Sequence, residues 1–175
     1  VTGWHTGYPD APAVIDINSY RKIPWEPDTA LFIADFQYSD GRPYPACPRQ
    51  LCKQILQKAD DMGFTVKSAF EYEFFLFDET PHSVREKKYE NLTPFTPGMF
   101  GYSVIRNSVH SEFYHDFIDT CQNMDMELEG LHTETGPGVL EACISVDSGL
   151  ASADKAALFK TFAKVMAQRW DLMAT

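Results

Sequence analysis

The 175-residue sequence lacks any apolar run near the roughly 18 residues that a membrane-spanning helix needs, so no transmembrane segment is predicted. It starts at Val1 instead of a methionine, and its first residues show no signal-peptide pattern. We therefore expect the interior of a longer, cytoplasmic protein.

Cysteines and basic residues are also few. The four cysteines form no CxxC pair; they are Cys47, Cys52, Cys121 and Cys143. In a chain of this length they are expected to be reduced thiols and not a disulfide framework. With 15 basic and 25 acidic residues, the net charge is −10, which argues against nucleic acid or an anionic membrane as a partner.

Apolar residues are plentiful, at 44% of the chain, and they include 13 Phe and 8 Tyr. Their periodicity predicts long helices that alternate with strands. The expected helices are 48–62, 109–124 and 152–170, and the expected strands are 30–36, 64–78, 127–134 and 139–146. This alternation predicts an α+β fold, in which a largely antiparallel sheet is covered by helices.

Two stretches show little periodicity. Residues 1–30 predict irregular structure with short strands at best, and 79–108 predict a long loop of the kind that is often functional or mobile. The helix after Cys47 is better defined, because Pro48 suits a first helical turn. Its apolar residues recur at helical spacing and form one stripe: Leu51, Ile55, Ala59 and Met62.

The strand within 64–78 carries two carboxylates among aromatic residues. Side chains alternate along a strand, so Glu71 and Glu73 project from the same face. Two residues of rise separate them by roughly 6.5 Å. Anions this close repel each other and lose hydration unless a positive charge lies between them. The pair therefore indicates a cation site, and the alternative is the solvated face of an edge strand.

A second group of carboxylates flanks a predicted hairpin whose turn reads Gly-Pro-Gly. If 137–138 is the centre of the turn, Glu134 lies opposite Glu141. His132 then lies opposite Cys143 on the same face. Opposed carboxylates destabilise a sheet, whereas a divalent cation between them, Mg²⁺ or Mn²⁺, would be bound by hard oxygen ligands. A Pro-Gly turn splays a two-residue hairpin, so the register is left open.

Two motifs carry a resemblance to a known family. From Phe70 the chain reads FEYEFFLFD, and from His132 it reads HTETGPGVLE. In this order and spacing the motifs resemble those of the glutamine synthetase family. The resemblance extends over nearly the whole chain, because 24–30 looks like the end of that family's N-terminal β-grasp domain and 153–160 matches the helix after the second glutamate pair.

The resemblance also implies a domain organisation. Residues 1–46 would be the C-terminal part of a β-grasp-like domain. Residues 47–175 would be the N-terminal part of a truncated catalytic domain, entered at the Cys-Pro-Arg sequence 47–49. The later histidine and the substrate arginines of the family lie outside this sequence, so we expect the 175-residue piece alone to lack activity.

Family membership would imply an ATP-dependent ligase. Such an enzyme joins the γ-carboxylate of glutamate to ammonia or an amine through γ-glutamyl phosphate, and it uses two or more Mg²⁺ or Mn²⁺ ions with ATP as co-substrate. By the motifs, Glu73, Glu134 and Glu141 would hold one metal ion. Glu71 would hold a second ion that bridges the ATP phosphates, and Glu129 would lie near the nucleotide. The family also implies a homo-oligomer.

One departure leaves the amine open. The family usually has Gln after the Gly-Pro-Gly turn, and this chain has Val139. The acceptor could therefore be ammonia, methylamine or a polyamine. Two readings from other classes remain: a structural relative of the family without catalysis, and a metal-binding module unrelated to ligases.

Overall fold

The structure is a computed structural model that describes residues 3–175 and divides them into two compact units. The first unit comprises the residues up to Ser68 together with Asp147–Asp154, and the second comprises Ala69–Val146 and Lys155–Thr175. Among the described residues, no helix combines the length and the apolar character that crossing a membrane requires.

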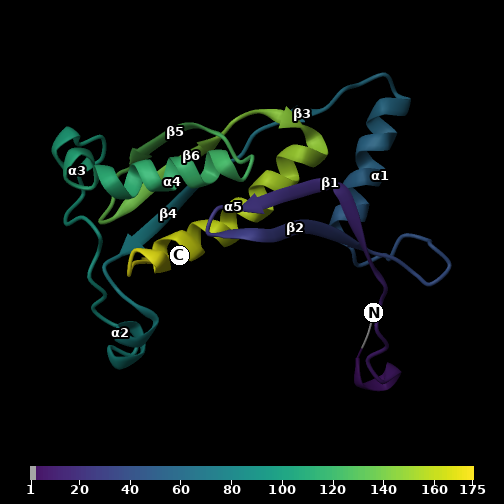
Figure 1. The fold of residues 1–175 in the computed structure, drawn as a ribbon, viewed down its shortest axis with the longest axis horizontal. Coiled ribbons are helices and arrows are strands. Elements are labelled where there is room, and N and C mark those ends of the chain that lie inside the picture. Colours follow the sequence, from purple (N-terminus) through teal and green to yellow (C-terminus); the bar gives the residue numbers. More distant parts are fainter. Residues whose placement is uncertain (1–2) are drawn as a thin grey trace. The chain divides into compact units, whose positions relative to one another are not determined.

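The first unit contains a long antiparallel hairpin, which Figure 1 shows as two neighbouring strands. It is formed by β1 (Ala13–Ile23) and β2 (Glu26–Phe36) and follows the short 3₁₀ helix η1 (Trp4–Thr6). The prediction of irregular structure over 1–30 is therefore wrong. The pairing shifts between Asp16 and Arg21, and this irregularity interrupts the period-two pattern by which a strand is recognised.

The first unit also holds α1 (Pro48–Asp61), the two-residue pair β3 (Lys67–Ser68) and β7 (Asp147–Ser148), and the start of α5 (Gly149–Arg169). The predicted helix after Cys47 is confirmed. Its apolar stripe, however, lies at the surface of this chain, since Leu51 and Ile55 are 57% and 58% exposed. The side of α1 with bonded partners carries Arg49 and Lys53 instead.

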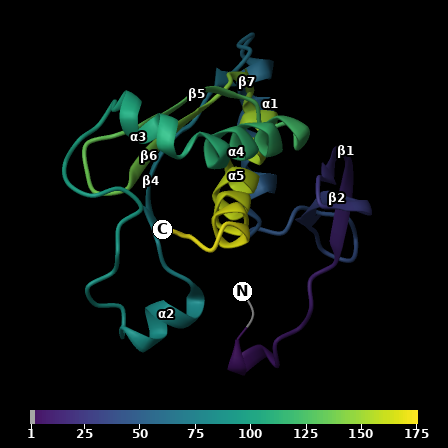
Figure 2. The same ribbon diagram turned by 60° about the vertical axis from the view of Figure 1, so that its left-hand side comes forward.

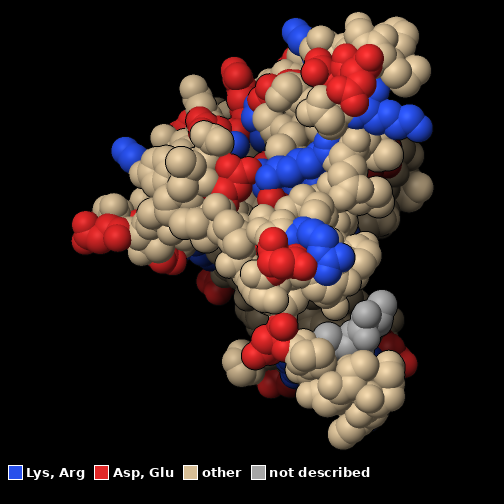
Figure 3. Space-filling view, turned by 90° about the vertical axis from the view of Figure 1, so that its right-hand side faces the viewer, with Lys and Arg blue, Asp and Glu red and all other residues tan. Residues whose placement is uncertain are grey.

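Arg49 is the centre of an ion-pair network in this unit. Its guanidinium donates two hydrogen bonds of 2.8 Å to Asp154 and single bonds of 2.9 Å to Asp35 and Asp16. Lys53 also pairs with Asp16 and Asp35. Burial alone would raise the pKa of Asp35, but the hydrogen bonds from Lys53 and Arg49 outweigh it and lower that pKa. On the molecular face in Figure 3, acidic and basic side chains likewise lie next to one another.

The second unit is built on a four-stranded antiparallel sheet with the order β5-β6-β4-β8. The helices α2 to α4 belong to the same unit, and Figure 2 shows α4 running along the sheet. The bounds are β4 (Glu71–Phe77), α2 (Pro81–Glu86), α3 (Val104–Val109), α4 (Ser111–Asn123), β5 (Leu128–Thr133), β6 (Val139–Ile144) and β8 (Met173–Ala174). The predicted α+β fold with a largely antiparallel sheet is confirmed.

Two details of the prediction need correction. The strand expected over 64–78 starts only at Glu71, because residues 67–68 pair with β7 in the other unit. The loop expected over 79–108 contains α2 and α3. Of the three helices expected over the sheet, α4 and the later part of α5 belong to this unit, whereas α1 belongs to the first unit and its place stays a prediction.

One face of the sheet packs on helices. Phe74 of β4 stacks on Phe117 of α4, with ring centroids 6.0 Å apart, and meets Phe159 of α5 edge-on at 6.1 Å. The core of this unit also contains the fully buried side chains of Leu76, Leu140, Ile144, Met124, Met126 and Met166. Because side chains alternate along a strand, the odd-numbered residues of β4 and β6 are left on the opposite face.

Candidate metal centre

Two rows of polar residues cross the sheet on the face opposite to the aromatic core. In the first row, Glu73 of β4 pairs with Glu141 of β6, and Glu141 pairs with His132 of β5. In the second row, Glu71 pairs with Cys143, which pairs with Gly130. Directly opposed residues have Cβ atoms about 4.5–5.5 Å apart, so each row brings its functional groups within reach of one another.

The side chains converge further at two places that share Glu141. In one group, His132, Glu134 and Glu141 offer ligand atoms that all lie within 4.8 Å of one another. His132 Nε2 is 3.3 Å from Glu141 Oε2 and 3.5 Å from Glu134 Oε1. In the other group, Glu71, Glu141 and Cys143 satisfy the same condition.

The register of the hairpin, which the sequence leaves open, differs by two residues from the pairing that a turn centred on 137–138 would give. Glu141 faces His132 instead of Glu134, and Cys143 faces Gly130 instead of His132. The reason is a longer connection: the Glu134 amide donates to the carbonyl of Val139 at 3.0 Å, which closes the strands before residues 135–138. A shift of two residues preserves the face of every side chain, so the carboxylates still converge.

Glu129 does not join the carboxylates of the two groups. It lies at an irregularity of β5, because Leu128 pairs with Ile144 while Gly130 already pairs with Cys143. Its side chain is exposed. Such an extra residue re-aims a side chain relative to its neighbours, so Glu129 is separated from the rows by local backbone geometry.

Tyr102 is a component that sequence reasoning missed. Its hydroxyl donates a hydrogen bond to Glu134, and its ring stacks on His132 with centroids 5.3 Å apart. The hydrogen bond from Tyr102, followed by one from the Thr135 amide, lowers the pKa of Glu134. Burial alone would raise the pKa of Glu134, but these two hydrogen bonds outweigh it.

A local feature brings Tyr102 to the site. A Cβ on Gly101 would lie 3.1 Å from the backbone carbon of Glu134 and 3.2 Å from the Thr133 carbonyl oxygen, so the segment before Tyr102 approaches β5 closely. The Tyr102 amide bonds to the same Thr133 oxygen at 2.9 Å. The only trace of this in the sequence is a glycine within a long polar loop, which does not specify a contact with a strand.

The donor chemistry divides the two groups. Carboxylate oxygens and an imidazole nitrogen are ligands that Mn²⁺ accepts, and carboxylate oxygens suit Mg²⁺ as well. The group of His132, Glu134 and Glu141 thus fits the cations expected from the sequence. A thiol suits neither of them, which sets Cys143 apart.

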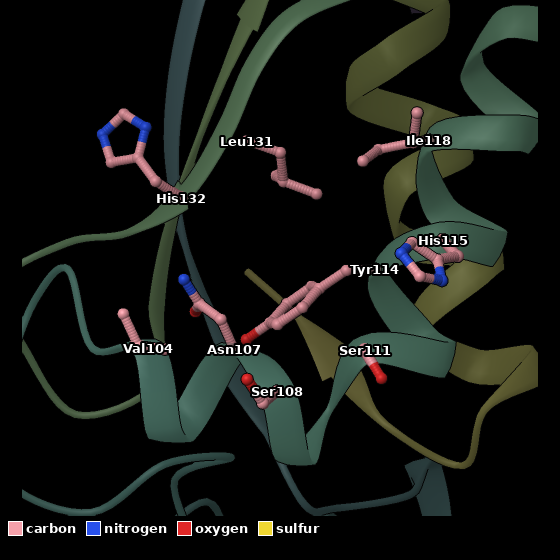
Figure 4. A pocket seen from close by; sticks show the side chains of 9 residues that line it. All are labelled: Val104, Asn107, Ser108, Ser111, Tyr114, His115, Ile118, Leu131 and His132. Atoms are coloured by element: carbon pink, nitrogen blue, oxygen red, sulfur yellow. The ribbon is translucent and has the colours of Figure 1, made fainter.

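A pocket of about 410 Å³ borders the site at His132. Figure 4 shows its lining side chains, which are Val104, Asn107, Ser108, Ser111, Tyr114, His115, Ile118, Leu131 and His132. Among the described residues, the Tyr114 hydroxyl has no hydrogen-bond partner, and burial raises the pKa of Tyr114 to about 12. No carboxylate lines this pocket, so it offers hydrogen bonds and apolar contact instead of a second set of oxygen ligands.

The fold is that of an α+β protein in which carboxylates and a histidine, side chains of the types that bind divalent cations, gather on one face of an antiparallel sheet. Residues 45–175 match the glutamine synthetase catalytic domain. The chain therefore belongs to the glutamine synthetase family.

Individual relatives agree with this assignment. The chain is 44% identical over 174 residues to "Type-1 glutamine synthetase 2" of Dictyostelium discoideum, which covers 99% of this chain and 33% of that protein. It is 29% identical to the glutamate–isopropylamine ligase of a Pseudomonas species, covering 99% of this chain and 38% of the relative. The chain thus spans between 33% and 38% of the length of these two curated relatives.

A solved structure shows the same fold. The chain superimposes on the GmaS/ADP complex with a TM-score of 0.81 at 25% identity, covering 95% of this chain and 37% of that one.

Proposed function

We propose that the protein is an ATP-dependent ligase that joins the γ-carboxylate of glutamate to ammonia or a small amine through γ-glutamyl phosphate. The observation that carries the proposal is the convergence of Glu71, Glu73 and Glu141 with His132 and Glu134 on one face of the sheet. A scaffold that positions carboxylates on three neighbouring strands suits a reaction in which metal ions must be held in fixed positions.

The metal ligands are assigned within this proposal. Glu73, Glu134 and Glu141 hold one Mg²⁺ or Mn²⁺ ion, and Glu71 holds another. When bound, such ions offset the negative charge on the transferring phosphoryl group. His132 lies within 3.5 Å of both Glu134 and Glu141, so it orients these two carboxylates. Glu129 is the residue that we assign to the nucleotide side.

Tyr102 has a positioning role in the proposal. Its hydroxyl holds the Glu134 carboxylate, and its ring fixes the plane of His132. A glutamate carboxylate is ionised at neutral pH before a cation binds, and the lowered pKa of Glu134 keeps it ionised at lower pH as well. Glu134 is thus a ligand in the correct charge state, and it does not have to lose a proton when a cation binds.

A small alkyl amine is the second candidate for the acceptor. Phe75 and Val139 are direct partners across β4 and β6, and they share the face of Glu73 and Glu141. This places an apolar pair next to the carboxylates, where an alkyl group would be buried more favourably than in water. One relative is named as an isopropylamine ligase, which supports the same reading.

The remaining parts of the proposal follow from family membership. We propose a β-grasp-like segment over 1–46 and the start of the catalytic domain over 47–175. We also propose that the full-length protein is a cytoplasmic homo-oligomer, with glutamate, ATP and the amine as its partners.

The experiment is a phosphate-release assay on the full-length protein with ATP and glutamate. Ammonia, methylamine, isopropylamine, ethanolamine and putrescine are supplied in turn as acceptors. Release that requires both glutamate and one of the amines supports the ligase and identifies the acceptor. Absence of release with every amine would contradict the proposal and favour a structural relative.

A further inference from the structure

Cys143 is the central residue of the second row, between Glu71 of β4 and Gly130 of β5. Its Sγ atom is 3.6 Å from Glu71 Oε1 and 3.8 Å from Glu141 Oε1. Its partner on the third strand is Gly130, and a Cβ at that position would be 4.0 Å from the sulfur. Because glycine has no side chain, this direct partner leaves the thiol uncovered, and Cys143 is only half-buried.

We propose that Glu71, Glu141 and Cys143 form a binding site for a thiophilic divalent cation such as Zn²⁺. The inference deepens the proposed function and rests on it in part, because two of the three ligands are shared with the Mg²⁺ or Mn²⁺ sites. It adds a sulfur ligand that the ligase reaction does not require.

The spacing of the three groups fits tetrahedral coordination. With Zn–S of about 2.3 Å and Zn–O of about 2.0 Å, sulfur and oxygen in a tetrahedral site are about 3.5 Å apart. The two Sγ–O distances of 3.6 and 3.8 Å are close to this value. All three ligand atoms lie within 4.8 Å of one another, so small side-chain rotations are sufficient to bind one ion, with water in the fourth position.

Ligand type determines which cation this site prefers. Zn²⁺ accepts thiolate and carboxylate together, whereas Mg²⁺ takes oxygen ligands. As the metal–sulfur bond forms, the thiol proton leaves to solvent. Glu141 is also assigned to the Mg²⁺ or Mn²⁺ ion of Glu73 and Glu134, so an ion held by Cys143 competes with that ion. Zinc should therefore displace Mn²⁺ and act as an antagonist at this face.

The test is spectroscopic and does not depend on activity. Co²⁺ is titrated into the full-length protein, and the near-ultraviolet charge-transfer absorption of a cobalt–thiolate bond is followed. We expect the absorption in the wild type and in C52S, a matched control because Cys52 is also half-buried. We expect it to be absent in C143S. Zn²⁺ affinity measured in excess Mg²⁺ should fall at least tenfold in C143S and stay unchanged in C52S.

Two results would overturn the inference: no charge-transfer absorption in the wild type, or an absorption that persists in C143S. The first does not depend on how any variant folds. E73Q separates this inference from the proposed function, because Glu73 is not one of the three ligands Glu71, Glu141 and Cys143. Loss of Mn²⁺ binding in E73Q with an intact cobalt–thiolate band supports two distinct sets, and a band lost in E73Q as well as C143S would contradict them.

Discussion

The Tyr102 hydroxyl donates a hydrogen bond to Glu134, which directly follows the end of β5. The same tyrosine ring lies over His132, tilted by only 16° from its plane. One side chain from a loop thus fixes two potential ligands at once. The hydrogen bond also raises the pKa of Tyr102, since ionising the phenol beside a carboxylate is unfavourable.

The first prediction concerns this hydrogen bond. In metal-free protein, Tyr102→Phe removes the main cause of the lowered pKa of Glu134, so that pKa should rise toward its ordinary value. Carbon-13 NMR titration of the glutamate carboxyl groups measures the change. Tyr89→Phe, which alters an exposed tyrosine of the same unit, serves as the control. An unchanged Glu134 titration in Tyr102→Phe would show that the contact does not persist in solution.

The second prediction concerns Mn²⁺. Glu73→Gln keeps the size of the side chain but removes the charge next to Glu141, so Mn²⁺ affinity should fall at least tenfold, equivalent to about 1.4 kcal/mol. Calorimetry with the full-length protein measures it. Glu112→Gln changes an exposed carboxylate on α4 and should leave the affinity as it is in the wild type. Equal binding by Glu73→Gln and wild type would remove Glu73 from the site.

The sequence predicts which side chains share a face of the sheet better than it predicts how the strands of the hairpin pair. Alternation alone places Glu71 and Glu73 together, because it depends only on the geometry of one strand. The pairing of Glu141 with His132 depends on how many residues the turn uses, and the sequence Gly-Pro-Gly is compatible with more than one answer. The difference of two residues preserves the side-chain faces, so the carboxylates remain on one face of the sheet.

Two other features could not be predicted from the local sequence pattern. The loop contact of Tyr102 joins residues far apart in the sequence, and no periodicity encodes it. The side of α1 that bonds to the hairpin carries Arg49 and Lys53, although the apolar stripe predicted the opposite side. Here ion pairs between distant residues outweigh the amphipathic pattern of the helix. The partners of Arg49 are three acidic residues outside α1, and their positions determine which side of α1 packs in the unit.

The third prediction concerns that ion-pair network. The Arg49 side chain is 11% exposed and neutralises three carboxylates, so Arg49→Ala leaves them largely buried with Lys53 as the remaining cation. Removing one partner of a buried pair costs about 3–5 kcal/mol of unfolding free energy. Arg42→Ala breaks an exposed pair with Asp40 and should cost at most about 1 kcal/mol. Urea denaturation compares the two, and similar losses would contradict the central place of Arg49.

The fourth prediction concerns acid. Glu79 is 2% exposed and accepts hydrogen bonds from Lys87, Ser83 and the Thr93 amide, and these lower its pKa from 4.5 to about 2. Because the folded pKa is the lower one, the stabilisation is complete above pH 4.5 and is lost as the pH falls toward 2. The loss of stability in Glu79→Gln should therefore shrink between pH 7 and pH 3.

Urea denaturation at the two pH values measures this difference. Glu86→Gln removes an exposed carboxylate from α2 and controls for the change in net charge. If the effect of Glu79→Gln were the same at both pH values, the bonds to Lys87, Ser83 and Thr93 would not depend on the charge of Glu79.

The last prediction tests the turn that sets the register. Gly138 has φ +71°, and a Cβ there would lie 2.3 Å from the Leu76 carbonyl oxygen and 3.0 Å from the Phe95 amide nitrogen. The Gly138 carbonyl also accepts the Leu76 amide at 2.7 Å, so the turn and β4 cannot separate without losing this bond. Gly138→Ala should cost about 2–5 kcal/mol, the sum of left-handed backbone strain and overpacking.

Gly41→Ala is the matched control. Gly41 has a similar φ of +85°, but a Cβ there would meet nothing within 4 Å, so only the backbone strain of about 1–2 kcal/mol applies. Urea denaturation gives both losses, and calorimetry with Mn²⁺ shows whether the carboxylates remain aligned. Because Gly138 lies next to β6, its substitution should weaken Mn²⁺ binding as well, whereas Gly41→Ala should not. Equal losses of stability in the two variants would mean that the turn yields to the added methyl group, and that its close approach to Leu76 does not fix the register.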